Sequence, residues 1–450
     1  MSLNAQKKNY PVSPLISAGG CVLAFVSSLA AADNPETPRQ IFLRAWYSVI
    51  AVDMVDADDK VIGQGSGVAV DAARVITACE VTKEVKEGKT GRVHLPGKFL
   101  KAVLQNAEPE RNLCQLNVPH LQAGPITLGT ARKLSVGDRA YAIGAQKGPN
   151  GWEPILSEAV VTNLRPHAGS QYIQISTAFS PSLRGGGLFD EQGRLIGILS
   201  LQFIEGENLI FAMPVDWISE LANRAQSPPA AAKKNGLNWL NRTFALEKQG
   251  NWRELLKLSQ QEVKREPSSA AAWFSIGLAS ANLKHYNQAV HAYREAIRNQ
   301  AEYGDAWHKL GVAYAYLKEY DHAIHAYLDA LRIQPENAGA WYDLGNTHYS
   351  LKQYAHAIYA YREALRIQPE NPKAWYNLGI TYDDLKLYGD AVEAYRETVR
   401  IQPENADAWY KLGVDYAIEG ESARVREVYQ ALRELDRARA ELYFNTYILP

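Results

Sequence analysis

A tryptophan recurs every 34 residues through the second half of the 450-residue chain, and this period constrains the fold more than any other feature. The tryptophans are Trp239, Trp273, Trp307, Trp341, Trp375 and Trp409. A Leu-Gly pair, an alanine and a proline recur with the same period, as in Leu310-Gly311, Ala323 and Pro335. Glycine and alanine let two helices approach closely and proline stops a helix, so each unit is predicted to be a helix–turn–helix pair that stacks on the next.

The period and its residues resemble the tetratricopeptide repeat over residues 237 to 436, which implies an all-α solenoid of about six repeats. The end units depart from the pattern, as capping units do. Thr243 replaces the glycine of the first unit, and Val425 and Arg437 replace the alanine and the proline of the last. We expect the segment Glu427 to Phe444 to extend as a helix over the final hydrophobic face.

The resemblance also implies a concave groove that binds a protein or peptide partner. The candidate partner-binding residues are His308, Lys309, Tyr342, Asn346, Tyr376, Asn377, Tyr410 and Lys411. The alternative is that these side chains only fill space between repeats. His322 and His325 lie one turn apart on a predicted helix, but no third ligand accompanies them, so no metal site is predicted. No cofactor is predicted either.

The first half has a different pattern, with short β-rich runs separated by glycine and proline. The predicted strands are Ala45–Val52, Gly67–Val70, Arg74–Thr77, Ala140–Ile143, Ile155–Val161, Tyr172–Ile175, Leu195–Leu201 and Leu209–Phe211. Many short strands in succession predict an all-β sandwich or a pair of barrels.

Several motifs in this half resemble those of trypsin-like serine proteases, and most closely those of the exported HtrA type. In chain order they are Gly65-Ser66-Gly67-Val68, Arg74-Val75-Ile76-Thr77-Ala78-Cys79, Tyr141-Ala142-Ile143-Gly144, Gly185-Gly186-Gly187-Leu188-Phe189-Asp190 and Phe211-Ala212-Met213-Pro214. The resemblance implies two six-stranded β-barrels with the active site between them. The expected fold is therefore a double β-barrel followed by an all-α solenoid.

The chemistry of that family needs serine as nucleophile, histidine as base and aspartate to orient the histidine. The matching positions here hold Arg184, Glu80 and Asn112. Ser182 replaces the glycine that shapes the oxyanion hole. Arginine offers only hydrogen-bond donors and cannot act as a nucleophile. We therefore expect no catalytic residues and a protease homologue that is inactive.

Substitutes for the triad are weaker alternatives. Glu80 could act as a base, but no hydroxyl stands at the serine position for it to activate. A carboxylate beside Cys79 raises the thiol pKa and suppresses a cysteine nucleophile. The histidines His94, His120 and His167 lie at positions that the fold does not direct into the cleft.

We expect instead an ion pair between Glu80 and Arg184, with Asn112 hydrogen-bonded to one of them. The alternative has both charged side chains in solvent. Cys79 and Cys114 flank the former histidine and aspartate positions, so the resemblance makes a disulfide between them plausible. Two buried free thiols remain the alternative.

The remaining segments suggest how the chain is organised. Lys7 and Lys8, the apolar stretch Leu15–Leu29 and small residues up to Ala32 are typical of a signal peptide, which predicts export, to the periplasm if the source is bacterial. An uncleaved anchor is the alternative. The net charge of −1 offers no footprint for nucleic acid. The predicted parts are a signal peptide at 1–32, a protease homologue at 40–222, a Pro- and Ala-rich linker at 223–236 and a repeat solenoid at 237–444.

Together these patterns predict an exported, inactive serine-protease homologue whose repeats act in protein–protein interaction. The alternative is an active serine-type endopeptidase to which the repeats deliver substrates. A third possibility is that the β domain is only a mount for the repeats.

Overall fold

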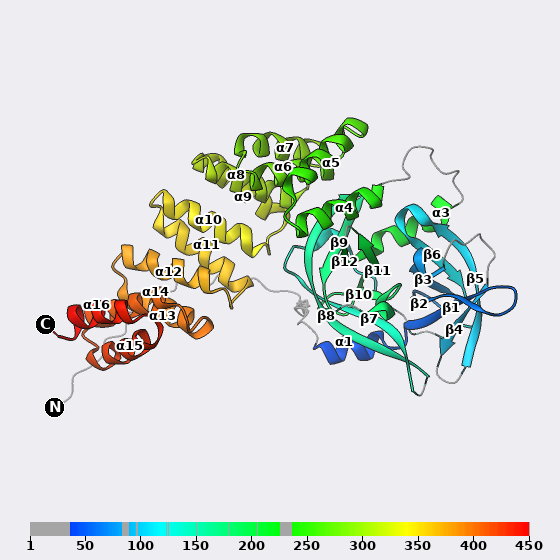
Figure 1. The fold of residues 1–450 in the computed structure, drawn as a ribbon, viewed down its shortest axis with the longest axis horizontal. Coiled ribbons are helices and arrows are strands. Elements are labelled where there is room, and N and C mark those ends of the chain that lie inside the picture. Colours follow the sequence, from blue (N-terminus) through cyan, green and yellow to red (C-terminus); the bar gives the residue numbers. More distant parts are fainter. Residues whose placement is uncertain are drawn as a thin grey trace, which may run out of the picture. The chain divides into compact units, whose positions relative to one another are not determined.

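The computed structural model describes residues 37–82, 90–95, 98–122, 124, 126–149, 151–178, 180–204, 206–225 and 236–449. The predicted signal peptide lies outside the described residues. Figure 1 shows two β-barrels followed by a series of paired helices. Both are part of one compact unit that spans Glu36–Pro450.

The first barrel closes in the strand order β1-β2-β3-β6-β5-β4. Its strands are β1 (Val49–Val55), β2 (Val61–Ala69), β3 (Arg74–Ala78), β4 (Thr90–Leu95), β5 (Lys98–Glu108) and β6 (Leu113–Asn117). Two short helices interrupt it: α2 (Cys79–Thr82) follows β3, and the 3-10 helix η1 (Pro109–Arg111) precedes β6. Both place candidate site residues at strand ends.

The second barrel closes in the order β10-β11-β12-β9-β8-β7. Its strands are β7 (Arg139–Gly148), β8 (Gly151–His167), β9 (Ser170–Ser176), β10 (Gly187–Phe189), β11 (Leu195–Ile204) and β12 (Glu207–Pro214). Short helices connect or follow them: η2 (Ala131–Lys133), η3 (Pro181–Leu183), η4 (Val215–Glu220) and α3 (Leu221–Ala225). The two six-stranded barrels confirm the expected fold of this half.

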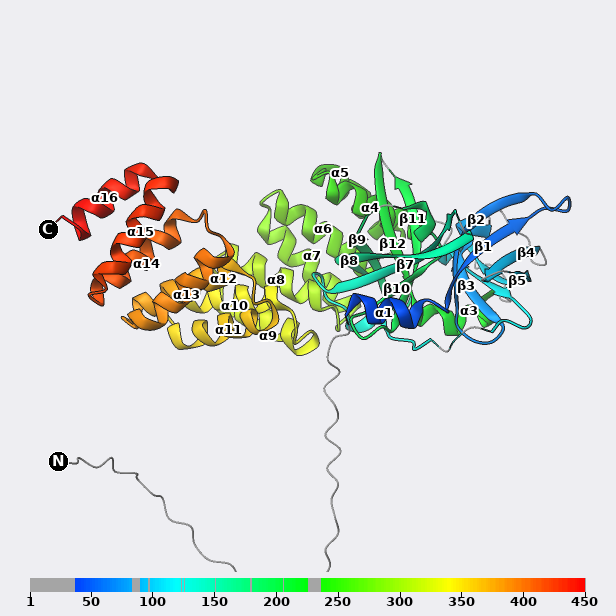
Figure 2. The ribbon, with the colours of Figure 1, turned by 90° about the horizontal axis from the view of Figure 1, so that it is seen from below.

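The sequence patterns missed some elements. The expected strand Ala45–Val52 begins too early, because α1 (Pro38–Ala45) occupies its first position. Thr37 caps α1 in a reciprocal pair with Gln40, which is a strong helix start. The helix lies against β7 (Figure 2). Strands β4, β5, β6 and β10 were not expected: β5 lacks a regular alternation of polar and apolar residues, and β10 has only three residues.

Thirteen helices form the rest of the described chain. They are α4 (Gly236–Lys248), α5 (Trp252–Arg265), α6 (Ala270–Asn282), α7 (Tyr286–Asn299), α8 (Gly304–Tyr316), α9 (Tyr320–Ile333), α10 (Ala338–Ser350), α11 (Tyr354–Ile367), α12 (Pro372–Asp384), α13 (Tyr388–Ile401), α14 (Ala406–Ile418), α15 (Ser422–Leu435) and α16 (Arg437–Tyr447). The alternation of paired helices confirms the predicted all-α solenoid.

The recurring residues have recurring contacts. A Cβ atom at Gly345 would lie 2.6 Å from Cε1 of Tyr361, and the same glycine–tyrosine contact recurs in the neighbouring units. The indole N–H of Trp341 donates to the carbonyl of Pro335 at 2.9 Å, which ties the start of α10 to the end of the preceding unit. Glycine is therefore required where the tyrosine ring packs, and tryptophan joins successive units.

The last unit differs from the expected single helix over Glu427 to Phe444. The chain breaks at Asp436, whose carboxylate accepts the backbone N–H of Arg439 at 3.0 Å and caps a new helix, α16. Tyr443 of α16 packs on Gly413, where the other units use a tyrosine of their own second helix. Thus the final face is covered as expected, but by a separate helix.

The first unit joins the second barrel. Its helix α4 shares one hydrophobic core with the barrels, and the Phe244 ring lies 5.4 Å from that of Phe211. The buried guanidinium of Arg165 on β8 pairs with Glu247 at 2.5 Å and lies over the rings of Phe244 and Phe274. The barrel and the first repeat are therefore bonded through buried groups.

Candidate peptidase cleft and repeat surface

The three triad-equivalent residues come from both barrels. Glu80 lies in α2, directly after β3. Asn112 has a left-handed backbone (φ 53°) between η1 and β6. Arg184 follows η3 in the second barrel. The loops that carry catalytic residues in the resembled fold therefore bring these replacements to one place.

The replacements contact one another and the second barrel. Oε1 of Glu80 accepts the backbone N–H of Leu201 at 3.1 Å and lies 3.9 Å from Nε of Arg184. Both charged side chains are mostly buried, with 24% of Glu80 and 32% of Arg184 exposed. Asn112 accepts the backbone N–H of Glu80 at 3.1 Å and donates to Oγ of Ser200 at 3.0 Å. Asn112 therefore bonds to the Glu80 backbone and bridges the barrels.

The environment of Glu80 acts on its charge in opposite ways. Burial raises the pKa of the Glu80 carboxyl above its ordinary value, while the N–H of Leu201 and the charge of Arg184 act to lower it. At 3.9 Å the pair with Arg184 is electrostatic and lacks a direct hydrogen bond. The contact joins α2 of the first barrel to the turn after η3 in the second barrel.

The backbone before Arg184 forms a 3-10 turn. The N–H of Arg184 donates to the carbonyl of Pro181 at 3.2 Å. Ser182 lies within this turn and has no positive φ. Ser66 fixes the turn, because its hydroxyl donates to the Ser182 carbonyl at 2.6 Å and accepts the N–H of Ala145 at 2.8 Å. An oxyanion hole needs free N–H groups that point at the substrate oxygen, and here the N–H of Arg184 is already bonded.

The backbone conformation after Arg184 requires a glycine. Gly185 has a positive φ of 79°, and a Cβ atom there would clash with the Ser66 carbonyl and the Thr77 hydroxyl. The turn is thus retained while the neighbouring side chain has changed.

Other polar candidates of this half lie elsewhere. His94 pairs with Asp53 at 2.8 Å and packs against Trp152, and His167 packs against Trp217. The structure joins Cys79 and Cys114 in a disulfide, with their Cα atoms 5.0 Å apart. Among the described residues no group of three His, Cys, Asp or Glu side chains is placed to hold a metal.

On the repeats, the residues that follow the tryptophans pack against tyrosines. The ring of His308 lies 5.9 Å from that of Tyr327, and Tyr342, Tyr376 and Tyr410 make equivalent contacts. His308 is also bonded to Asp343 at 2.8 Å. These side chains thus have a packing role.

The polar candidates form bonded groups. Nδ2 of Asn377 donates to Tyr342 at 3.1 Å and to Oδ1 of Asn346 at 2.9 Å. Lys411 contacts Asp383 at 3.3 Å, and the charge of Lys309 acts on buried Asp305. The structure brings Tyr342, Asn346 and Asn377 together and holds the two lysines beside carboxylates.

Sequence reasoning missed Tyr316, Tyr349 and Asp384 at the ends of the first helices of their units. Tyr349 donates to Asp384 at 2.8 Å, and Tyr316 is 64% exposed. The signal that could have found them is chemical variation at a fixed repeat position, because packing positions stay constant from unit to unit.

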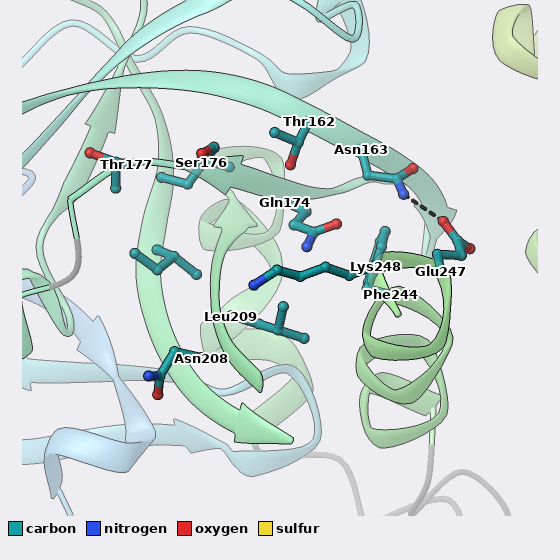
Figure 3. Close-up of a pocket in the computed structure, with 12 residues that line it drawn as sticks. Thr162, Asn163, Gln174, Ser176, Thr177, Asn208, Leu209, Phe244, Glu247 and Lys248 are labelled. Atoms are coloured by element: carbon teal, nitrogen blue, oxygen red, sulfur yellow. Dashed lines mark hydrogen bonds between the residues drawn. The ribbon is translucent and has the colours of Figure 1, made fainter. Parts of the chain in front are cut away.

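A pocket of about 430 Å³ lies between β8, β9, β12 and α4 (Figure 3). Glu247 accepts the amide of Asn163 at 2.7 Å at one side of it, and Lys248 crosses it to pair with Glu207 at 2.7 Å. The wall formed by α4 is thus held to the barrel by bonded charges.

Comparison with known families matches both halves. Residues 65–198 match the trypsin-like peptidase domain. Residues 270–303, 304–337 and 372–405 match the tetratricopeptide repeat, and residues 345–386 match a further TPR repeat family. The chain therefore contains a trypsin-like peptidase domain followed by tetratricopeptide repeats.

Curated relatives match part of the chain. The putative serine protease HhoA of Synechocystis is 26% identical over 36% of this chain and 43% of its own length. A probable periplasmic serine endoprotease DegP-like of Pseudomonas putida is 29% identical over 28% of this chain and 27% of its own. The anti-sigma-I factor RsgI9 of Acetivibrio thermocellus is 29% identical over 40% of this chain and 25% of its own length. The chain spans less than half the length of these relatives, two of which are named as serine proteases.

Solved structures with a similar region include MamA, at 23% identity and a TM-score of 0.35 over 37% of this chain and 97% of that one. Another is YrrB, described as a TPR protein with an unusual peptide-binding site, at 20% identity and a TM-score of 0.37. The match covers 40% of this chain and 95% of YrrB. Among the described residues no helix is both long and apolar enough to span a membrane.

Proposed function

We propose that the chain is an exported, catalytically inactive trypsin-like protease homologue whose repeats bind a protein or peptide partner. The observation that carries the proposal is Arg184 at the nucleophile position, with its backbone N–H donated to Pro181. On this assignment the site lacks the hydroxyl that attacks a carbonyl, and the Arg184 N–H is not free to stabilise the resulting oxyanion.

The replacements also occupy the cleft. The Glu80 carboxylate accepts a hydrogen bond from the Leu201 N–H and pairs electrostatically with Arg184, so both charged groups already have partners. A peptide that enters the cleft would have to displace these partly exposed charges, so the pair opposes its approach. The arrangement supports a structural role for the former catalytic residues.

Two features support export. The N-terminal sequence has the order of a signal peptide, and disulfides such as Cys79–Cys114 persist in oxidising compartments. Relatives whose names include "periplasmic" agree with this. Fractionation of cells that express the full chain tests it: recovery of a disulfide-bonded protein outside the cytoplasm is expected, and a reduced cytoplasmic protein would contradict it.

Peptidase activity is tested on casein, with a serine-reactive fluorophosphonate probe alongside. The matched variant carries Glu80→His, Asn112→Asp and Arg184→Ser, with and without Ser182→Gly. We expect neither turnover nor labelling in the natural chain, and labelling only in the variant that also restores Gly at 182. Turnover by the natural chain that survives repeated purification would instead support the active endopeptidase.

A further inference from the structure

The first helices of successive repeats share one polar face. His308 on α8 bonds to Asp343 on α10, and Tyr349 on α10 bonds to Asp384 on α12, each at 2.8 Å. Asn377 on α12 donates back to Tyr342 on α10. Because these bonds link equivalent helices, the side chains lie on the same side of the array, which we call the inner face.

A pocket of about 270 Å³ opens on the inner face between α8 and α10. One side is apolar or aromatic, with Val312, Ala315, Tyr316 and Tyr320, and the other is polar, with Asp343, Asn346, Thr347 and Ser350. The exposed ring of Tyr316 is held in place, because it stacks on Tyr286 with centroids 4.7 Å apart and planes within 5°. The pocket is thus large enough for a bulky apolar side chain, and its aromatic wall is already ordered.

Asn346 supplies a directed donor beside this pocket. Its Oδ1 accepts from the Tyr361 hydroxyl at 2.8 Å and from Asn377 at 2.9 Å. With the oxygen held in this way, the Nδ2 group is oriented, and within the described part of the chain it has no acceptor. A carbonyl of an extended backbone is the ligand that such an amide binds.

Asp384 supplies a charge next to the same pocket. Tyr349, which donates to it, is the neighbour of the pocket residue Ser350. Asp384 is exposed, and no lysine or arginine among the described residues pairs with it. The nearby Asp383 differs, since Lys411 and Tyr395 already contact it. Asp384 is therefore available to a basic group of a ligand.

We propose that the inner face binds an extended peptide that inserts a large apolar side chain into the pocket and presents a lysine or arginine to Asp384. Packed helices are about 9 Å apart, so α12 lies about one and a half spacings, or roughly 13 Å, from a pocket between α8 and α10. An extended chain advances about 3.3 Å per residue, so the two side chains are separated by about four residues. This rests on the proposed function only in that the repeats bind a peptide.

The test is fluorescence anisotropy with the full chain and labelled nine-residue peptides in a Ser/Asn background. The matched peptides carry Phe and Lys four residues apart, in either order, and the controls carry Glu for Lys or Ala for Phe. We expect one matched peptide to bind about tenfold more tightly than either control. Asp384→Asn removes the preference for Lys, and Tyr316→Ala removes the preference for Phe. Glu434→Gln, on the exposed surface of α15, changes neither.

Equal affinity for the matched and control peptides would overturn this inference and leave peptide recruitment by the repeats standing. So would tight binding that neither Asp384→Asn nor Tyr316→Ala affects, because the peptide would then sit elsewhere. Failure of every peptide to bind would overturn both the inference and the proposed recruitment of peptides.

Discussion

The two halves of the chain retain different parts of the patterns they resemble. In the barrels, Gly185 has the positive φ and the close contacts that its turn requires, while Glu80, Asn112 and Arg184 stand where the motifs predict the catalytic residues of the resembled proteases. In the repeats, the packing pairs recur from unit to unit, as at Gly345 and Tyr361, while inner-face residues vary. In both halves, residues that determine the fold are separable from residues that determine chemistry.

The largest loss of stability is expected from a change that removes the buried ion pair between the barrel and the first repeat. Arg165→Ala leaves the buried carboxylate of Glu247 without its partner, and we expect a loss of about 4 kcal/mol in the free energy of unfolding. Urea denaturation of the full chain measures it. Lys248→Ala, which removes a more exposed pair with Glu207, is the control and costs about 0.5 kcal/mol. Equal effects would mean that the junction is not held by the buried pair.

A smaller loss of stability is expected from a change at Gly185, the glycine of the turn after Arg184. Gly185→Ala forces a side chain into a left-handed conformation and against the carbonyl of Ser66, so we expect about 3 kcal/mol of destabilisation. Thermal unfolding with far-UV circular dichroism is the readout. Gly151→Ala, which also has positive φ but meets no atoms, serves as the control for strain alone. If both variants lose the same stability, the close approach to Ser66 contributes nothing.

The repeats contain a carboxyl whose titration affects stability. Burial, together with the neighbouring charge of Asp383, raises the pKa of Asp415 to about 8. Between the ordinary pKa of 3.8 and this value the folded chain keeps a proton that the unfolded chain has lost. Stability is therefore expected to fall as the pH rises from about 4 to about 8. Unfolding measured across this range is less pH-dependent in Asp415→Asn, and an unchanged slope would contradict the assignment.

The smallest effect concerns the former catalytic cleft. The Glu80–Arg184 pair is partly exposed and 3.9 Å apart, so Arg184→Ala is expected to change the free energy of unfolding by about 0.5 kcal/mol. Differential scanning calorimetry at two salt concentrations detects it. A loss of several kcal/mol would show that the pair has replaced catalysis with a major stabilising role.

Periodic and motif signals predicted the fold class, because they come from packing constraints repeated along the chain. They did not predict α1, whose capping box involves only a few residues, or β10, whose pairing depends on distant strands. They also did not reveal the break between helices at Asp436. In other units a proline marks such a break, whereas here the side chain of Asp436 caps the new helix.

For the candidate sites, sequence reasoning was most informative where a motif fixed a position. The surrounding sequence motifs predicted that Glu80, Asn112 and Arg184 would lie together. The hydrogen bond from Arg184 to Pro181 depends on backbone angles that a sequence motif does not specify. On the repeats, the candidates were chosen because they follow each tryptophan, yet Tyr316 lines the pocket from the end of its helix. Asp384 is bonded to Tyr349, which precedes the pocket residue Ser350.

The hydrogen bond from Leu201 to Glu80 has a consequence for the surface of the second barrel. The pairing of β11 with β10 ends at Ile198, and Leu199 then bonds to the backbone of Gly185 and Gly186. The backbone that remains unpaired with β10 on that side begins after Leu199. An open edge invites a foreign strand, and proteins protect such edges with charged side chains. By occupying the Leu201 N–H, the Glu80 carboxylate blocks strand addition beside the exposed ring of Phe203. The Glu80 carboxylate thus occupies a backbone donor that an added strand would need.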